Sequence, residues 1–97
     1  MTYKLTDNNQ KEIVKCFRSN GFSVISLASL GKGVPDLIVG KGNVNYLVEV
    51  KNGPKAKLTP DQIKFHAEWQ GQKCVVSSLD DLRGYFFIEM KPITTKG

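Results

Sequence analysis

The sequence predicts an α/β fold in which a mixed sheet is flanked by helices, in the order helix, three strands, helix, strand. Three observations predict it: an N-terminal apolar stripe at helical spacing, apolar strand-like runs with a hairpin signal between two of them, and a strongly capped second helix before a last apolar run. A chain of 97 residues is expected to form one domain over residues 1–97. The polar residues 91–97 are expected to form a frayed, flexible tail.

The first element is expected to be a helix that starts with a cap at Thr6 or Asp7. Asp7 and Gln10 fit the pattern of a capping box. Asn20 and Gly21 end the pattern, because both residues accept the left-handed conformation that closes many helices. A core-facing stripe at helical spacing consists of Ile13, Val14 and Phe17.

Three strands are expected next, at residues 22–29, 36–40 and 45–51. The first run alternates apolar and small polar residues, whereas the second is short and continuously apolar. Between the second and third runs stands GKGN, which favours a tight hairpin, so this pair is predicted to be antiparallel.

A second helix is expected after Thr59, with Pro60 at its first position and Gln62 three residues after the cap. Residues 73–78 then read as a fourth strand, and residues 79–90 as a short helix or a mixed ending. Besides Gln62, one side of the second helix carries Phe65, His66 and Trp69, of which Trp69 is expected to pack in the core.

The charge balance favours a polyanionic partner. Fourteen Lys and Arg residues against nine Asp and Glu give a net charge of +5 and a pI near 9.3. Nucleic acid is the first such partner to consider, since a basic surface attracts phosphates. Acidic residues near a DNA-binding surface would repel those phosphates unless a cation lay between them.

Several other classes of protein are not expected. No apolar run approaches the ~20 residues that span a bilayer, and the N-terminus lacks the apolar stretch of a secretory signal. Two distant cysteines and one histidine do not make a zinc site. We expect Cys16 and Cys74 to be reduced thiols that act as small hydrophobes, with a disulfide between them as the minor alternative. No membrane association and no small-molecule cofactor are expected.

Charged residues within the expected strands indicate a metal-binding site. Glu49 and Lys51 are two apart in a strand and therefore point to the same side. Closing the GKGN turn would bring Asp36, at the start of one strand, opposite the end of the other. Two carboxylates at such range call for a cation, and hard oxygen ligands suit Mg²⁺ or Mn²⁺. Each of these residues also has an ordinary structural explanation. Asp36 could be a turn aspartate, and Glu49 with Lys51 could form a surface ion pair that stabilises the fold by ~0–1 kcal/mol.

The motif VPD followed by EVK resembles the catalytic motif of the PD-(D/E)xK nuclease superfamily, whose restriction-endonuclease-like core has this order of elements. More narrowly, GKGVPDLIVG, YLVEVKNG and LTPDQIKFHAEW resemble the VRR-NUC (virus-type replication-repair nuclease) family, from roughly residue 9 to residue 82. The resemblance implies a stand-alone nuclease of the type that resolves Holliday junctions, working as a homodimer on branched DNA. The expected compartment is the cytoplasm of a bacterial cell or of a phage-infected host.

The resemblance also implies roles for individual residues. Asp36, Glu49 and the carbonyl of Val50 would hold the metal ion, and Lys51 would be the catalytic lysine. Glu12 matches a further acid near the metal, although an exposed helical glutamate is the ordinary reading. Gln62 matches an active-site glutamine, or serves only as a helix cap. Lysines expected to flank the site and contact DNA phosphates are Lys32, Lys41, Lys55 and Lys57.

Three alternative functions stay open at this point. One is a flap-cutting or restriction-like DNA nuclease, since the same motif serves several kinds of cut. Another is a non-catalytic DNA-binding module that has kept the fold. The third is a protein-interaction domain in which the pair of acids is incidental, and which divalent ions would not stabilise. Dimerisation is also suggested by the apolar segment at residues 84–90, which could instead complete the core.

Overall fold

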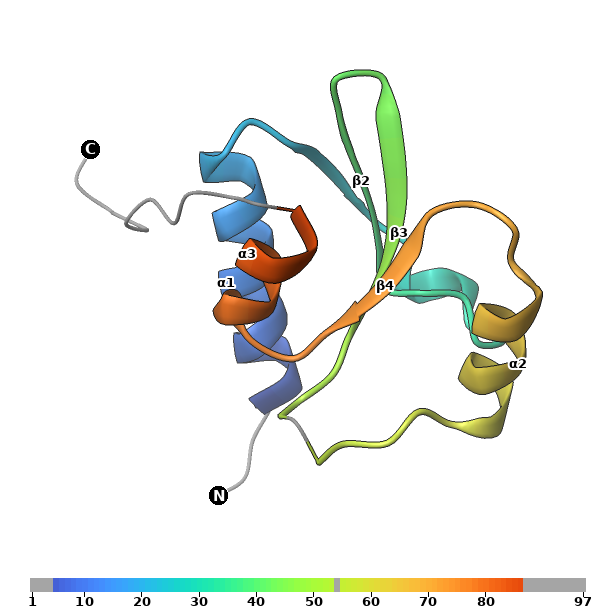
Figure 1. Cartoon of the computed structure of the whole chain (residues 1–97). Coiled ribbons are helices and arrows are strands. Elements are labelled where there is room, and N and C mark those ends of the chain that lie inside the picture. Colours follow the sequence, from blue (N-terminus) through green and yellow to red (C-terminus); the bar gives the residue numbers. More distant parts are fainter. Residues whose placement is uncertain (1–4, 54, 87–97) are drawn as a thin grey trace.

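The β2–β3 hairpin is the centre of the sheet (Figure 1). A computed structural model describes residues 5–53 and 55–86, with side chains described from Asn9 onward. Thr6 and Asp7 already lie within α1, so the expected caps at these residues are wrong. The expected tail at residues 91–97 lies outside the described residues. The elements are α1 (Leu5–Ser19), β1 (Ser23–Ser26), the 3-10 helix η1 (Ala28–Leu30), β2 (Leu37–Lys41), β3 (Val44–Val50), α2 (Pro60–Glu68), β4 (Lys73–Val76) and α3 (Leu79–Phe86).

The sheet is mixed, as predicted. Its strand order is β1-β2-β3-β4, with antiparallel pairing up to β3 and a parallel pair between β3 and β4. Lys41 pairs with Val44, so Gly42 and Asn43 alone form the turn, with φ of 60° and 67°. Two consecutive positive φ values characterise the type I′ turn that joins twisted antiparallel strands. The predicted hairpin is therefore confirmed.

α1 ends in the way its sequence predicts. The amide of Phe22 donates to the carbonyl of Phe17 at 3.0 Å, and the amide of Gly21 donates to that of Arg18 at 3.1 Å. Gly21 has a φ of 88°, which glycine adopts without a steric penalty. These two bonds form a Schellman motif, which turns the chain from the end of α1 directly into β1.

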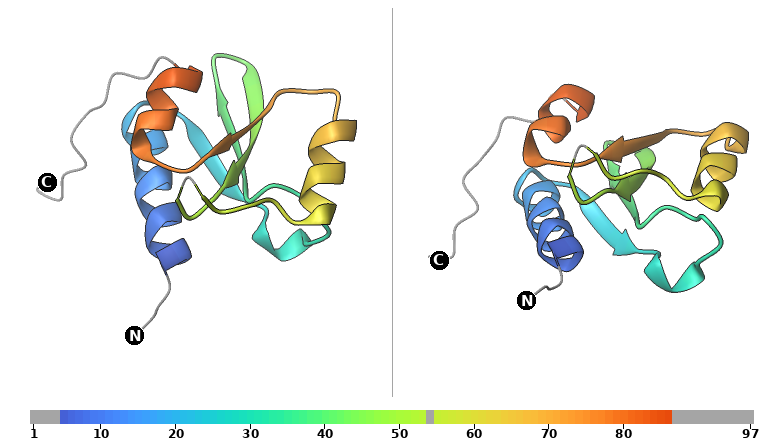
Figure 2. Two further views of the ribbon diagram at one scale, coloured as in Figure 1. Left: turned by 60° about the horizontal axis from the view of Figure 1, so that its bottom comes forward. Right: turned by 90° about the horizontal axis from the view of Figure 1, so that it is seen from below.

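The core lies between the sheet and the helices α1 and α3, which lie together on one side of it, while α2 lies on the other side (Figures 1 and 2). The rings of Phe17, Phe22 and Phe86 meet edge to face, with centroids 5.1 to 5.7 Å apart. Packing of this kind supplies most of the stability of a small domain. Other buried core residues are Ile13, Cys16, Leu37, Val39, Val48, Val50, Cys74, Val76 and Leu82.

Both cysteines and part of the apolar segment at residues 84–90 pack in this core. Cys16 and Cys74 are buried on α1 and β4 and are not joined to each other, as expected. Phe86 packs against the aromatic cluster, whereas Tyr85 is 54% exposed. The rest of the segment at residues 84–90 lies outside the described residues from 87 onward.

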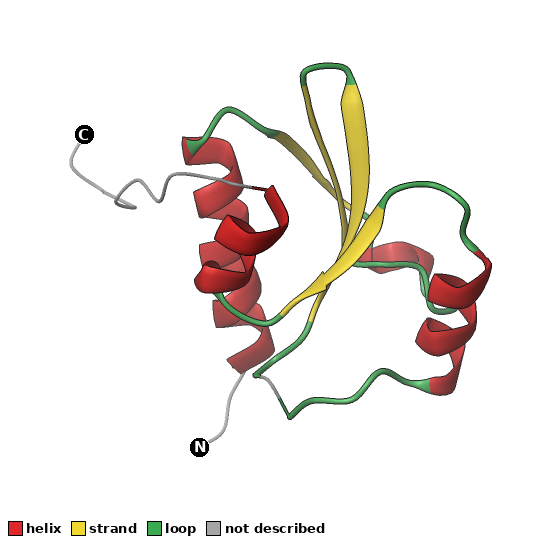
Figure 3. Ribbon diagram, viewed as in Figure 1, coloured by secondary structure: helices red, strands yellow, loops and turns green. Residues whose placement is uncertain are grey.

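Two strands are shorter than predicted. β1 ends at Ser26 because the hydroxyl of that serine accepts a hydrogen bond from the amide of Ala28 at 3.3 Å, which starts the turn into η1. β4 ends at Val76, since the amide of Ser77 donates to the carboxylate of Asp81 at 2.6 Å and thereby joins the start of α3. Figure 3 shows both strands running into these helical turns.

α2 contains no buried residue, and the expected core position of Trp69 is wrong. Trp69 directly follows the last helical residue and is 44% exposed, with its ring stacked on that of Phe65 at 5.4 Å. Ile63 on the same helix is 56% exposed. α2 therefore buries no side chain completely, and its Phe65 and His66 are half-buried.

Candidate active site

Asp36 lies immediately before β2 and is fixed at both its backbone and its side chain. Its carbonyl accepts a hydrogen bond from the amide of Leu27 at 2.7 Å. Its carboxylate oxygen Oδ2 accepts one from the amide of Val50 at 2.8 Å. Because Leu37 pairs with Val48, the next position along the hairpin sets Asp36 opposite Glu49, as the sequence predicts.

Glu49 is the buried acid of this site, with only 2% of its surface exposed. Its neighbours Val48 and Val50 face the core, so its own side chain points to the other side of the sheet, where α2 lies. One carboxylate oxygen, Oε2, accepts a hydrogen bond from Nε2 of Gln62 at 3.1 Å. The other, Oε1, is buried without a hydrogen-bond partner in the described structure.

The proximity of the two carboxylates changes the titration of Glu49. Burial, a hydrogen bond with Asp36 that is available only to the protonated carboxyl, and the negative charge of Asp36 together raise the pKa of Glu49 to about 8, against a partial lowering by the charge of Lys51. The isolated site therefore holds a proton on Glu49 near neutral pH. A bound cation would take the place of that proton.

Lys51 and Gln62 complete the group. The carboxamide oxygen of Gln62 accepts from the ammonium of Lys51 at 3.4 Å and from the amide of Thr59 at 2.9 Å. The hydroxyl of Thr59 accepts in turn from the amide of Gln62 at 3.2 Å, which completes the predicted capping box. Gln62 is thus both the cap of α2 and a direct contact of Glu49 and Lys51.

Two further residues, of which sequence reasoning missed Asn9, support these positions. Nδ2 of Asn9 donates to the carbonyls of Lys51 at 2.8 Å and of Ser77 at 3.3 Å, which ties α1 to the ends of β3 and β4. The signal was an amide four residues before Ile13, on the buried side of the helix. Gly33 has a φ of 81°, and a Cβ there would collide with the backbone carbonyl of Asp61 in the first turn of α2.

The structure does not bring every predicted site residue together. Glu12 is exposed on α1, and the described residues contain no group of three or more Cys, His, Asp or Glu side chains that could hold a metal. Lys41 lies at the other end of β2 from Asp36, about 16 Å along the strand, and its ammonium donates to the carbonyl of Asn20 at 2.7 Å. The expected position of Lys41 beside the site is therefore wrong.

The other expected DNA contacts are exposed lysines in loops. Lys32 lies in the connection that leads to Asp36, and Lys55 and Lys57 lie in the connection between β3 and α2. His66 is half-buried, and burial and the charge of Lys73 lower its pKa. Its ring lies beside that of Phe65, with centroids 6.1 Å apart.

The chemistry of the site fits a hard divalent cation. Glu49 presents a buried oxygen that lacks a partner, next to a second carboxylate that is held by a backbone amide. Such an oxygen is unfavourable when it is ionised and unpaired, and a cation would satisfy it. The donors are carboxylate oxygens, which Mg²⁺ and Mn²⁺ prefer. Asp36 and Glu49 are therefore the residues whose side chains fit such an ion.

Among the described residues, no helix is long and apolar enough to cross a membrane.

Comparisons with known proteins agree with this geometry. The family model for the VRR-NUC domain matches residues 1–80. A solved structure described as a VRR_NUC domain superposes with a TM-score of 0.75 and 28% sequence identity, and the match covers 87% of this chain and 99% of the other. No curated protein matches. With its α/β core, its mixed sheet and the sequence of its two central strands, the chain belongs to the VRR-NUC family of nuclease domains.

Proposed function

We propose that the protein is a metal-dependent endonuclease that hydrolyses phosphodiester bonds in branched DNA, of which a Holliday junction is one example. The observation that carries this proposal is the buried, unpartnered Oε1 of Glu49 beside Asp36, with Lys51 held next to it by Gln62. The family membership supports DNA as the substrate.

Asp36 and Glu49 would hold Mg²⁺ or Mn²⁺, together with the carbonyl of Val50. When bound, such an ion would supply Lewis-acid polarisation of the phosphate and a lowered pKa of water. Asp36 keeps its orientation through the amide of Val50, and Gln62 orients Glu49 through Nε2. Because burial and Asp36 raise the pKa of Glu49 to about 8, its carboxyl group would have to give up a proton before it could hold an ion near neutral pH.

Lys51 contributes a positive charge beside the two carboxylates. Its ammonium lies 3.4 Å from the carboxamide oxygen of Gln62 and near enough to Glu49 to lower the pKa of that acid. A cation so placed stabilises negative charge that develops on a phosphate during attack, and it can orient the attacking water. Lys55 and Lys57, on the adjoining loop, would contact backbone phosphates and make binding sensitive to salt.

Lys51→Met should reduce cleavage by about 10²–10³-fold, because it removes this charge and keeps the aliphatic stem. The assay uses Mn²⁺ or Mg²⁺ with a synthetic four-way junction, a flap and a linear duplex. The junction should be cut fastest by the wild type. Lys64→Met, an exposed lysine on α2, is the matched control and should cut as the wild type does.

Each alternative function that involves DNA has its own outcome in this assay. Equal cutting of the linear duplex would exclude a preference for branched DNA, and fastest cutting of the flap would favour a flap nuclease. Binding without any cutting, at every divalent ion tested, would favour the non-catalytic module. Wild-type activity in Lys51→Met would contradict the role given to Lys51.

We further propose a homodimer, because a two-fold axis would present two active sites to a branched substrate. Exposed apolar side chains support it: Ile63 is 56% exposed and Trp69 44% exposed on the helix that carries Gln62. Light scattering should give twice the 10.8 kDa of one chain. A mass of one chain at micromolar concentration, with or without DNA, would contradict the dimer.

A further inference from the structure

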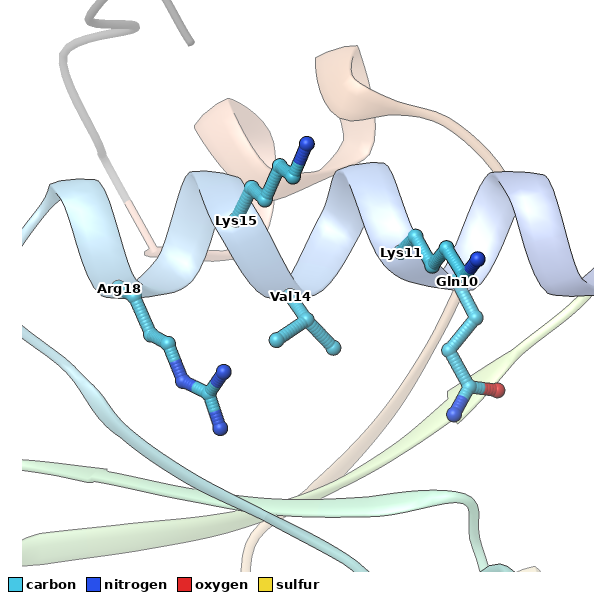
Figure 4. A pocket seen from close by; sticks show the side chains of 5 residues that line it. All are labelled: Gln10, Lys11, Val14, Lys15 and Arg18. Carbon is cyan, nitrogen blue, oxygen red and sulfur yellow. The ribbon is translucent and has the colours of Figure 1, made fainter. Parts of the chain in front are cut away.

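A hollow of about 350 Å³ on α1 has a strongly one-sided charge. Its lining contains three cationic side chains and no carboxylate. Figure 4 shows Arg18, Val14 and Gln10 projecting from α1 toward the strands, whereas the side chain of Lys15 points away from them. The complete lining is Gln10, Lys11, Val14, Lys15 and Arg18.

The three cations follow one another along the helix. Lys11, Lys15 and Arg18 are four and three residues apart, a spacing that places the three positions within one broad face of the helix, with Lys15 and Arg18 at its two edges. Seven residues of helix span about 10 Å, which corresponds to about three nucleotides of one duplex strand. Nη2 of Arg18 also donates to the carbonyl of Val24 at 3.2 Å, which orients its guanidinium in advance.

A second hollow of similar size differs from the hollow on α1 in the charge of its lining. It has a volume of about 390 Å³, and its lining combines the cations Lys32 and Lys64 with the anions Asp61 and Glu68. Its formal charges cancel, so it offers no net attraction to a polyanion. The hollow on α1 differs by carrying three uncompensated positive charges in its lining.

The position of α1 connects this hollow with the candidate active site. Asn9, next to Gln10, donates to the carbonyl of Lys51, so the N-terminal part of α1 touches the site. Lys11, Lys15 and Arg18 then lead away from it along the helix. A strand that leaves the site in this direction would meet one positive charge per turn.

We propose that Lys11, Lys15 and Arg18 form a binding site for the phosphodiester backbone of DNA outside the cleaved bond. The proposal rests on the proposed function for the identity of the polyanion. Contacts of this kind position the substrate without reading its sequence. They contribute affinity that falls steeply with salt concentration, because each neutralised phosphate releases counterions.

The test is the double variant Lys11→Gln/Lys15→Gln, which leaves the anchored Arg18 in place. Its affinity for the four-way junction, measured by fluorescence anisotropy in EDTA, should fall about 10-fold or more at ~0.1 M salt. The slope of log K against log salt concentration should decrease in size by about 2, one unit for each lost contact. Its cleavage rate at saturating DNA should stay within about twofold of wild type.

The matched control is Lys64→Gln/Lys73→Gln, which changes the net charge equally with exposed lysines of α2 and β4. It should keep the wild-type affinity and slope, and thermal melting should confirm that both variants fold. An unchanged slope in the α1 variant, or an equal loss in the control, would overturn the proposal even if the wild type cuts DNA. If the wild type binds but does not cut, the nuclease proposal fails, and the comparison of slopes still decides the α1 site.

Discussion

Asp36→Asn should abolish cleavage, with a loss of about 10³-fold or more, while junction binding stays within about threefold of wild type. The asparagine oxygen can still accept the hydrogen bond that the amide of Val50 now donates at 2.8 Å, so the shape of the hairpin end is kept. Only the negative charge is lost, and with it one oxygen that could hold a divalent ion. Single-turnover cleavage with Mn²⁺, beside anisotropy of the same junction, measures both quantities.

The control for this variant is Asp80→Asn, which makes the same chemical change at an exposed position of α3. It should cut as the wild type does. Cleavage by Asp36→Asn at a wild-type rate would remove Asp36 from the site. A parallel loss of junction binding would instead assign Asp36 to DNA contact.

The second large effect concerns stability without metal. Since the pKa of Glu49 rises from 4.5 to about 8 on folding, the protonated carboxyl stabilises the native state fully below pH 4.5. That contribution should be lost as the pH rises from about 4.5 through 8, when the native site must give up its proton. The free energy of unfolding in EDTA, measured with urea, should therefore decrease over this window by on the order of 4 kcal/mol.

Two comparisons isolate Glu49 in that experiment. Glu49→Gln should remove most of the pH dependence, because the amide does not titrate, and it should also lose cleavage. Addition of Mn²⁺ at pH 8 should restore stability to the wild type but not to Glu49→Gln, since an ion stabilises only the state that binds it. A wild-type protein whose stability in EDTA is flat from pH 5 to 8 would contradict the buried carboxyl pair.

The elements that sequence reasoning predicted well are those that depend on local chemistry. The Gly42–Asn43 turn needs two positive φ values, and the Thr59–Gln62 box needs only four consecutive residues. The hairpin register then follows from the turn, so the meeting of Asp36 with Glu49 could also be predicted. Each of these steps extends over a short stretch of chain.

The errors concern packing between distant segments. Nothing near Trp69 in the sequence shows that α2 buries no side chain completely and leaves that ring half exposed. Lys41 is close in sequence to Asp36, but an extended strand carries it to the end of α1, where it bonds Asn20. The contact of Asn9 with Lys51 joins residues 42 positions apart and depends on how α1 packs across the sheet.

The shared carboxamide of Gln62 bears on how such an enzyme could lose activity over evolutionary time. Replacing Gln62 would disturb Glu49 and Lys51 and would also weaken the start of α2, so selection for a folded chain protects this residue even after catalysis is no longer useful. The side chain of Asp36 has one structural contact, the hydrogen bond from the amide of Val50, and the side chain of an asparagine could accept it equally well. A descendant that has turned from cutting to mere binding should therefore carry a changed Asp36 long before it carries a changed Gln62.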